Sequence, residues 1–366
     1  MAERKLIAES EAPLKAIISG EHGVVYGTPG ITMVLEPKTK VSLFEEEGEP
    51  CLVLKSNRGE VTLSPDGTVI GEPNPQFSPF VEMAKYLIKQ HGFQPKKKLT
   101  AEIEAVGSKG MGASASIAAA LGACLFYAMG KKIAICHDAE KNELWQAVQV
   151  AEEIAHGGRA SGIDPMTVVA GPTQLTRLLV DGKPNWKFEK KTVSLPKGTA
   201  IIIVDTFTGG KRSSTGEMIK TLAERYGLLQ GGAPKTLMQL TPEDKEKLKP
   251  FSAVFEKILK NLNPKGNPIA LGEAFGENQA LLKNGGVSTE RIDEAVRIAK
   301  EHGAYGAKLT GAGGEGGAVI ALAPEKESRR LEHIFGQHKF RVFPAKPAKG
   351  GTRLTFKGKL IARHKR

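Results

Sequence analysis

Residues 306–317 read Gly-Ala-Lys-Leu-Thr-Gly-Ala-Gly-Gly-Glu-Gly-Gly, and this stretch says more about the fold than any other part of the chain. Its interpretation depends on two other segments of the chain. Residues 12–27 contain an early lysine, Lys15, and a Gly-Glu-His turn at 20–22, and residues 110–115 read Gly-Met-Gly-Ala-Ser-Ala. A glycine cluster lets backbone N–H groups approach a polyanion, because no Cβ stands in the way. The two glycine clusters, the lysine and the turn together predict a fold built around a nucleoside triphosphate.

The chain has 366 residues, which is long for a single core and about right for two lobes. Hydrophobic residues make up 40% of it, and the 42 glycines favour tight turns and close ligand approach over a disordered chain. The net charge of +12 favours a polyanionic ligand, but the basic residues are spread along the chain, so a solvated surface explains most of the charge. Short basic runs at 96–98 and 363–366 have no interleaved aromatic residues to stack on bases, and we therefore expect no nucleic-acid partner.

Three cysteines, Cys51, Cys124 and Cys136, cannot form a complete set of disulfides, and none belongs to a Cys-x-x-Cys pair. The sequence opens with a mixed, charged segment instead of the apolar region of a signal peptide. Its longest apolar run, at about 117–129, is shorter than the ~20 residues that cross a bilayer. We therefore expect a cytoplasmic protein without a membrane partner.

The pattern of apolar and turn-forming residues predicts a mixed α+β protein. Strands are expected at 41–44, 52–54 and 61–63 as an antiparallel meander, and further strands at 99–106, 200–204, 318–322, 341–343 and 354–356. Helices are expected at 80–90, 114–129, 143–155, 215–229, 242–262, 269–283, 289–302 and 326–335. A polar stretch before residue 197 predicts the boundary between two lobes, residues 1–196 and 197–366.

A glycine-rich loop at 107–112 follows the strand expected at 99–106 and opens the helix expected at 114–129. The free N–H groups and the positive dipole end of that helix would face an anion held in the loop. The glycine spacing is that of a P-loop, but Ala113 stands where that motif requires lysine, which disfavours a P-loop NTPase. A tight strand-to-helix turn without a ligand is the alternative explanation.

Two carboxylates between residues 152 and 164 could face a single site. Glu152 lies near the end of an expected helix, and Asp164 follows a Ser-Gly turn. The first suits Mg²⁺, which prefers oxygen ligands, and the second suits a group that accepts or orients the proton of an alcohol. An Asx-turn is the commoner role of an aspartate in such a place. A lone lysine such as Lys15 is, likewise, usually solvated.

The three segments, in this order, resemble the signature motifs of the GHMP kinase superfamily, and residues 151–164 are similar to the motif Glu-x-x-x-His-Gly-x-x-Ser-Gly-x-Asp of its mevalonate kinase family. The resemblance covers about residues 10–345. It implies the two-lobed GHMP kinase fold, with a ribosomal protein S5 domain 2-like N-terminal lobe that binds ATP and a ferredoxin-like C-terminal lobe. It further implies Mg²⁺-dependent phosphoryl transfer from ATP to the small-molecule substrate mevalonate, in isoprenoid biosynthesis.

The same resemblance implies roles for individual residues. Asp164 is the catalytic aspartate, and Lys15 is the lysine beside it that stabilises the nucleophile and the transferred phosphoryl group. Ser114 and Glu152 bind the metal. The ATP-binding residues are Lys109, Gly110, Met111, Gly112, Ala113, Ser114, Ala115, Gly311, Ala312 and Gly313, and the substrate-binding residues are Glu21, His22, Asp164 and Thr310. Arg212 and Thr215 lie where the family has a loop on the substrate side.

The chain departs from the family pattern in each of the glycine-rich motifs and beside the lysine. Ala113 replaces the first serine of the phosphate loop, and Leu14 replaces a glycine ahead of Lys15. Glu315 stands where the family has glycine. Because a carboxylate facing a triphosphate would be repulsive, we expect that of Glu315 to point away, or to contact a metal or a cationic group.

The segment that leads to Asp164 is one residue longer than the family motif, between His156 and Ser161. Counting back from Asp164 therefore leaves Glu153 as an alternative to Glu152 for the metal. His156 is expected to be a structural residue at the end of its helix.

The identity of the acceptor rests on few residues. Residues 23–27 read Gly-Val-Val-Tyr-Gly after the Gly-Glu-His turn, which disfavours a galactokinase, because that family continues with Thr-Asp-Tyr. Phosphomevalonate kinase, homoserine kinase and mevalonate 3-kinase are alternatives. A non-catalytic nucleotide-binding protein is the competing class, favoured by the net charge and by Ala113 and Glu315. The sequence indicates no oligomeric state, so a homodimer is left open.

Overall fold

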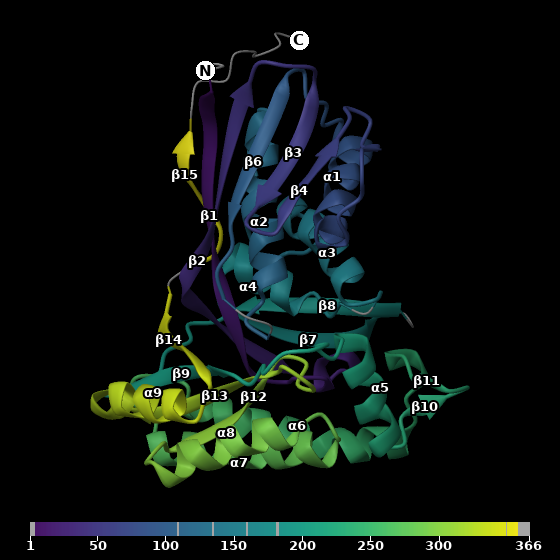
Figure 1. Ribbon diagram of the computed structural model, residues 1–366. Coiled ribbons are helices and arrows are strands. Elements are labelled where there is room, and N and C mark those ends of the chain that lie inside the picture. The colour runs from purple at the N-terminus through teal and green to yellow at the C-terminus, as the bar shows by residue number, and fades with distance from the viewer. Residues whose placement is uncertain are drawn as a thin grey trace.

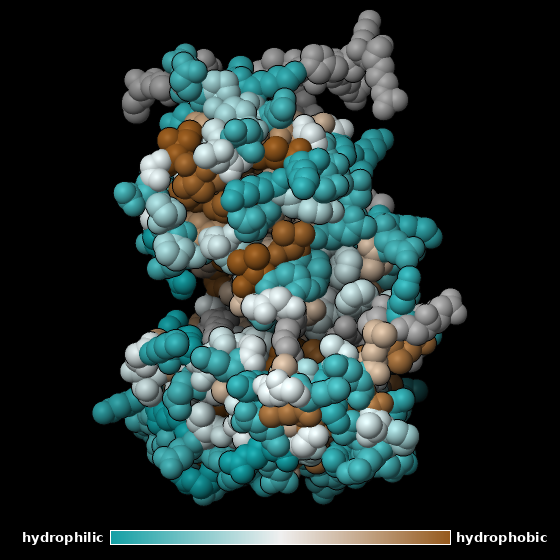
Figure 2. All heavy atoms as spheres, turned by 90° about the vertical axis from the view of Figure 1, so that its right-hand side faces the viewer, coloured by the Kyte–Doolittle hydropathy of each residue, from teal (hydrophilic) through white to brown (hydrophobic). Residues whose placement is uncertain are grey.

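The computed structural model describes residues 4–107, 110–133, 135–158, 160–180, 183–348 and 350–357 of the chain. Two long antiparallel strands, β1 (Lys5–Ser19) and β2 (Gly30–Glu46), extend from the upper lobe in Figure 1 into the lower one. The surface narrows between the lobes (Figure 2). The two-lobed α+β architecture predicted from the sequence is confirmed.

The upper, N-terminal lobe is a sheet with helices packed on one face (Figure 1). Its strands are β6 (Lys98–Glu104), β3 (Cys51–Ser56), β4 (Gly59–Leu63) and β5 (Val69–Ile70), in this order from β2 to the sheet edge. Its helices are α1 (Ser78–His91), α2 (Ala113–Ala128), α3 (Glu143–Ala155) and α4 (Ile163–Ala170). Helix α2 consists largely of alanine and other small residues, so its backbone can lie close to β1 and β2, and it is buried on nearly all sides.

The lower, C-terminal lobe has the strand order β12-β13-β9-β14. These strands are β12 (Gly306–Thr310), β13 (Ala318–Pro324), β9 (Thr199–Asp205) and β14 (Arg341–Pro347). The helices are α5 (Thr215–Arg225), α6 (Pro242–Asn261), α7 (Pro268–Asn284), α8 (Glu290–Glu301) and α9 (Ser328–Gln337). A short hairpin of β10 (Leu229–Gln230) and β11 (Ala233–Pro234) follows α5.

A shared hydrophobic core joins the two lobes. The lower halves of β1 and β2 contribute Leu14, Ile18 and Ile31, which pack in one cluster with Ile203 of β9 and Phe255 of α6. Burying one such side chain contributes roughly 1.5–3 kcal/mol. Because this core is built from both lobes, we expect the lobes to keep their relative position, which is what holds a site between them.

Several helix starts are capped by side chains. Ser214 and Glu217 form a capping box at α5, and Thr241 and Asp244 form one at α6. The helix expected from residue 289 is confirmed, and the Thr289 hydroxyl accepts from the Ile292 amide at its start. Among the helices that the structure describes, none is both long and apolar enough to span a membrane.

The strand pairing differs from the expected meander. The hairpin of β3 and β4 is antiparallel as predicted, but β6 lies between β2 and β3 and runs parallel to β3. Helix α1 provides the crossover that a parallel pair requires. The apolar pattern of a strand reports its buried face and not its neighbours, so the meander was the wrong choice of partners.

One further segment was not anticipated from the sequence, and the strand expected at 354–356 is confirmed but has a partner that the sequence did not indicate. The polar stretch that was expected to separate the lobes forms a hairpin, β7 (Thr173–Val180) with β8 (Lys183–Lys190), which pairs with the start of β2. Strand β15 (Arg353–Lys357) returns to the N-terminal lobe and pairs with β1. The lobe division at residues 196 and 197 stays a prediction, and β15 lies with the first lobe despite its place in the sequence. The basic run at 363–366 lies outside the described residues.

One helix–strand contact depends on a glycine. A Cβ on Gly272 of α7 would lie 2.2 Å from the carbonyl oxygen of Tyr305, which directly precedes β12. We predict that Gly272→Ala lowers the free energy of unfolding by about 1–3 kcal/mol, because a backbone atom blocks the added methyl group. Gly276→Ala, on the same helix with open space around it, should instead raise stability by about 0.5–1 kcal/mol. Urea denaturation of both variants measures the difference, and equal effects would contradict the packing argument.

Candidate active site

A pocket of about 490 Å³ is lined by residues of both lobes. The N-terminal lobe supplies Lys15, Glu21, His22, Arg58, Gly110, Gly112, Ala113, Ser114, Glu152, His156 and Asp164 to its wall, and the C-terminal lobe supplies Arg212, Thr215, Ile219, Gly311, Ala312 and Arg341. The three glycine- and lysine-containing motifs and the two carboxylates that the sequence singled out therefore meet in one cavity.

Lys15 lies at the centre of this arrangement. Its side chain is only 1% exposed, and its Nζ lies 2.8 Å from Oδ2 of Asp164 and donates to the carbonyl of Gly110 at 3.3 Å. Its amide also donates to the carbonyl of Met111 at 2.9 Å. A Cβ on Gly112 would lie 2.8 Å from two carbons of the Lys15 side chain, so glycine is required for the lysine to pass the loop. The ammonium group is thus held between the loop and the carboxylate.

Asp164 lies in the first turn of α4, where the positive end of the helix dipole favours a carboxylate. The turn before it is fixed from behind, because Nε1 of Trp145 donates to the carbonyl of Gly162 at 3.1 Å. Gly162 has φ = 80°, the left-handed conformation that favours glycine. Oδ1 of Asp164 is buried and accepts no hydrogen bond from the described residues. One oxygen of this carboxylate is therefore bound to Lys15 and the other is available to a ligand.

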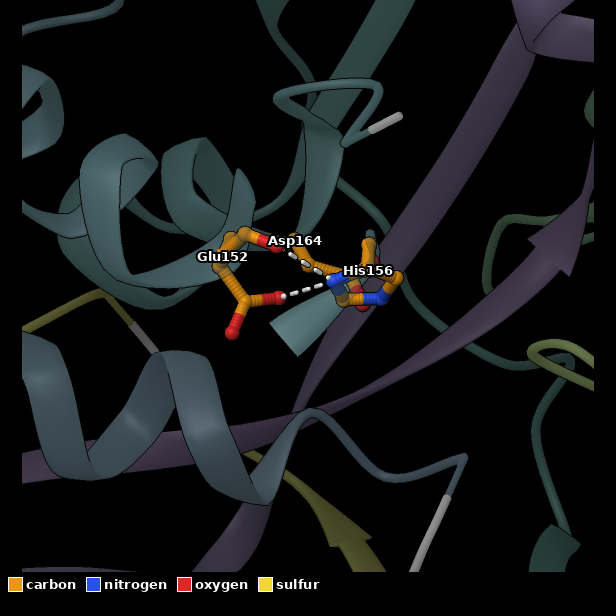
Figure 3. A group of neighbouring side chains, drawn as sticks. All are labelled: Glu152, His156 and Asp164. Carbon is orange, nitrogen blue, oxygen red and sulfur yellow. Dashed lines mark hydrogen bonds and ion pairs between the residues drawn. The ribbon is translucent and has the colours of Figure 1, made fainter. Parts of the chain in front are cut away.

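Glu152, in the last turn of α3, faces Asp164 and His156 (Figure 3). Burial raises the pKa of Glu152, the negative charge of Asp164 adds to the rise, and His156 and Ser114 oppose it. Within the described part of the chain, neither oxygen of Glu152 has a hydrogen bond of normal geometry. Oε2 of Glu152 lies 3.4 Å from Nδ1 of His156, and Asp164 is half-buried. A buried carboxylate beside a second one suits a divalent cation, which would compensate their charge. Glu152, His156 and Asp164 offer atoms that all lie within 4.8 Å of one another.

The two neighbouring glutamates of α3 have different surroundings. Glu153 accepts from Nε2 of Gln149 at 2.7 Å and from the amide of Ala160 at 3.3 Å, and it does not line the pocket. The geometry therefore favours Glu152 over Glu153 as the candidate metal ligand. His156 caps α3, and its Nδ1 lies 2.9 Å from the carbonyl oxygen of Glu152, as expected of a residue at a helix end.

The glycine-rich loop leads into the N-terminus of α2, with Gly112 as its N-cap. Gly110, Gly112, Ala113 and Ser114 line the pocket. The side chains of Met111 and Ala115 are buried in the hydrophobic cores, so only their backbone could face a phosphate. Lys109 lies outside the described residues, and its role stays a prediction.

The two glycine loops touch each other. A Cβ on Gly311 would lie 2.8 Å from Cα of Gly110, and one on Gly110 would lie 2.9 Å from the carbonyl oxygen of Thr310. Gly311 and Ala312 line the pocket, whereas Gly313 is buried against the carbonyl oxygen of Val287. This close approach explains why both motifs need glycine even where no ligand is in contact.

Thr310 has a different place from the one expected. It is completely buried behind the pocket wall, and its hydroxyl donates to the carbonyl of Ile17 and accepts from the amide of Ile17, both at 3.0 Å. The hydroxyl thus donates one hydrogen bond and accepts another within the protein, which links β12 to β1, and Thr310 does not line the pocket. The expectation that it binds substrate is therefore corrected to a structural link between the lobes.

Two departures from the family pattern have simple structural consequences. Leu14 is fully buried, and the space in front of it is kept free by Gly107, on which a Cβ would lie 2.6 Å from the leucine side chain. Glu315 is exposed and does not line the pocket, as expected of a carboxylate that points away. Its backbone pairs with Ser213, which ties the third motif to the loop before α5.

Two arginines of the pocket, unlike Arg212, had no recognised signal in the sequence. Arg58, at the turn between β3 and β4, and Arg341, at the start of β14, line the cavity from opposite lobes. Arg212 stacks on the Phe207 ring with its guanidinium carbon 3.9 Å from the ring centre, and its Nη2 lies 3.3 Å from the buried Asp205. Single arginines in unrelated segments look like surface charges until the fold brings them together.

The comparisons with known proteins agree with this geometry. The family models described as GHMP kinases N terminal domain and GHMP kinases C terminal match residues 79–171 and 255–340. The mevalonate kinase of Thermococcus gammatolerans is 30% identical over 335 residues, which cover 87% of this chain and 90% of that protein. That of Thermococcus onnurineus is 29% identical over 330 residues, with the same coverage.

Solved structures show the same fold. The mevalonate kinase of Methanococcus jannaschii has a TM-score of 0.73 at 24% identity, over 94% of this chain and 99% of that one. The L. major mevalonate kinase in complex with R-mevalonate has a TM-score of 0.69 at 20% identity, over 95% and 100% of the two chains. The chain belongs to the GHMP kinase family. Within that family, the relatives named here are mevalonate kinases.

The link made by Thr310 can be tested by substitution. We predict that Thr310→Val lowers the free energy of unfolding by about 1–3 kcal/mol, because the buried amide and carbonyl of Ile17 lose their partner. Thr310→Ser keeps the hydroxyl, so its free energy of unfolding should fall less than that of Thr310→Val. The KM for the acceptor should stay within about threefold of wild type in the serine variant. A serine variant of full stability with a large rise in acceptor KM would contradict the structural role.

Proposed function

We propose that the chain is a mevalonate kinase, which transfers the γ-phosphoryl group of ATP to the 5-hydroxyl of mevalonate and forms 5-phosphomevalonate in isoprenoid biosynthesis. The observation that carries the proposal is the contact of the Lys15 ammonium with both Asp164 and the phosphate loop. This contact joins a candidate base, a cationic stabiliser and an anion-binding loop within one pocket. The extended similarity to mevalonate kinases supports this choice of acceptor.

The donor would lie across the two glycine loops. The first-turn N–H groups of α2 and the positive end of its dipole favour a phosphate at Gly112 to Ser114. Gly311 and Ala312 border the same cavity from the other lobe. Arg58 extends the positive charge around the pocket on the side of the β3–β4 turn. ATP, with four negative charges near neutral pH, fits this surrounding better than an uncharged ligand.

Mg²⁺ would be held by Glu152 and Ser114, on the side of the phosphate loop. Glu152 supplies two buried oxygens that no hydrogen bond of normal geometry satisfies in the described chain, and a hard cation prefers such ligands. Bound there, the cation would neutralise charge on the phosphate oxygens. Without it, the buried negative charge of Glu152 would repel the donor.

The acceptor hydroxyl would lie at Asp164. Its proton passes to the free Oδ1 of Asp164 while the hydroxyl oxygen forms the new bond to phosphorus and the bond from phosphorus to ADP breaks. The Lys15 ammonium, 2.8 Å from the other oxygen of Asp164, stabilises the negative charge on the attacking oxygen and on the transferred group. Rigid placement of both groups lowers the barrier, because no reorganisation is needed.

The rest of the pocket suits a small, branched hydroxy acid. Val24, Val25 and Ile219 give an apolar wall for a methyl group. Arg212, held in place by Asp205 and by the carbonyl of Gly316, presents a guanidinium that suits a carboxylate. Mevalonate carries both features together with a primary alcohol.

Three cysteines, Cys51, Cys124 and Cys136, are free thiols. This absence of disulfides supports the cytoplasmic location that we propose for the enzyme.

A panel of acceptors tests the function. ADP release from Mg-ATP would be measured with mevalonate, phosphomevalonate, homoserine and galactose, together with mass analysis of the product. We expect turnover with mevalonate and 5-phosphomevalonate as product. Turnover with another acceptor alone would reject mevalonate while keeping kinase chemistry, and ATP binding without any turnover would favour a non-catalytic nucleotide-binding protein.

The role of Asp164 gives a sharper test. Asp164→Asn should lower kcat by at least ~10²-fold, because the amide cannot accept the hydroxyl proton. The Kd for ATP, measured by calorimetry, should change little, since the asparagine keeps the shape of the side chain. Lys15→Met serves as a companion variant that should lower kcat while the protein stays folded. Near-normal turnover of Asp164→Asn would remove this residue from the proton-accepting role.

A further inference from the structure

Lys308, in the centre of β12, is a fully buried lysine that the mechanism above does not use. Its ammonium forms an ion pair with Oε1 of Glu21 and donates to the carbonyl of Leu309 at 2.7 Å. Glu21 belongs to the turn after β1, so the pair joins the two lobes. A buried ion pair of this kind is seldom needed for stability, because apolar residues of similar volume often serve as well. Its presence beside the pocket therefore calls for another explanation.

The other oxygen of Glu21 gives that explanation. Oε2 is buried and accepts no hydrogen bond from the described residues, although the residue borders the pocket. A buried acceptor without a donor costs free energy in the empty pocket, and a ligand hydroxyl would remove that cost. Burial raises the pKa of Glu21, whereas the charges of Lys308 and, to a lesser degree, Lys15 oppose the rise. Lys308 thus favours the form of Glu21 that can only accept.

The side chain of the adjacent His22 is also held by a contact with the C-terminal lobe. Its Nε2 lies 2.9 Å from the carbonyl oxygen of Ala312, and its φ of 59° is unusual for a residue other than glycine. Burial lowers the pKa of His22 to about 4, so the ring is neutral near pH 7 and Nε2 donates to that carbonyl. Lys308 and Ala312 therefore hold the two side chains of the Gly-Glu-His turn from the third motif.

We infer that Lys308 is a positioning residue of the acceptor site: its ion pair with Oε1 fixes the Glu21 carboxylate so that Oε2 accepts a hydrogen bond from a hydroxyl of the bound acceptor. The inference rests on the proposed function in that it requires a hydroxylated acceptor. Mevalonate has two hydroxyl groups, and the one that is not phosphorylated suits Glu21, because Asp164 receives the other.

A double-mutant cycle on Lys308 and Glu21 tests the inference. Lys308→Met and Glu21→Gln should each lower kcat/KM for the acceptor by at least about 30-fold, the loss typical of breaking a buried charge pair. The double variant should be no worse than Glu21→Gln, because Lys308 acts through Glu21. The Kd for ATP should stay within about threefold of wild type in all three proteins. Losses that multiply, or an equal loss of ATP affinity, would overturn the inference.

A control variant separates positioning from stability. Lys235→Met breaks the ion pair of Lys235 with the buried Asp244, 2.7 Å apart, and neither residue lines the pocket. It should lower the melting temperature without changing acceptor kcat/KM. Lys308→Met leaves a buried carboxylate unpaired and could fail to fold. In that event the inference is tested by comparing Glu21→Gln with the double variant Glu21→Gln/Lys308→Met. If the double variant has an acceptor kcat/KM more than about tenfold below that of Glu21→Gln, Lys308 does not act through Glu21.

The outcome is independent of the identity of the acceptor. The cycle is run with whichever acceptor wild type phosphorylates in the panel, so a wrong assignment of mevalonate leaves the cycle readable. With mevalonate, a second arm uses 5-hydroxy-3-methylpentanoate, which lacks the 3-hydroxyl. Its kcat/KM should fall for wild type but change little between wild type and Lys308→Met. An equal loss on both substrates would show that Lys308 does not act on that hydroxyl.

Discussion

The ammonium of Lys15 is the constraint around which the site is organised. A lysine that is 1% exposed needs partners for its charge, and the fold supplies Asp164 and the carbonyl of Gly110. These partners come from the start of α4 and from the loop before α2, so the charge holds β1, the glycine-rich loop and the turn that carries Asp164 together. The same arrangement that satisfies a buried charge places a cation beside a free carboxylate oxygen. Stability and chemistry therefore depend on one contact.

Close backbone approach is the second requirement. Gly112 leaves room for the lysine side chain, and Gly110 and Gly311 bring two loops from different lobes into contact. A hydroxyl, that of Thr310, then links the neighbouring strands β12 and β1. The pocket lies at the junction, where glycine loops and arginines of both lobes meet the carboxylates of the N-terminal lobe. The shared core is built from both lobes, and we expect it to keep these groups in place, which electrostatic stabilisation of a transition state requires.

Much of the site could be predicted, and the failures have specific causes. The two glycine-rich loops, Glu152 and Asp164 stand out by residue type and spacing, and the resemblance to the GHMP kinase motifs added Lys15 and Glu21; the structure places all of them around one pocket. Thr310 was misplaced, because a threonine beside a glycine loop looks the same whether its hydroxyl faces a ligand or a strand. The pairing of Lys308 with Glu21 joins residues nearly 290 positions apart, and no local pattern reports such a contact.

The sequence by itself determined the class of fold, the two glycine-rich loops and the order of most helices and strands. These depend on local physics: glycine where φ is positive or a Cβ would collide, a cap where a helix begins, and an apolar face where a segment is buried. Only the tertiary structure decided that β6 lies between β2 and β3, that Glu152 and not Glu153 borders the pocket, and that Arg58 and Arg341 reach it from opposite lobes. These choices depend on contacts between distant segments, whose energies are set by packing in three dimensions and leave no periodic trace along the chain.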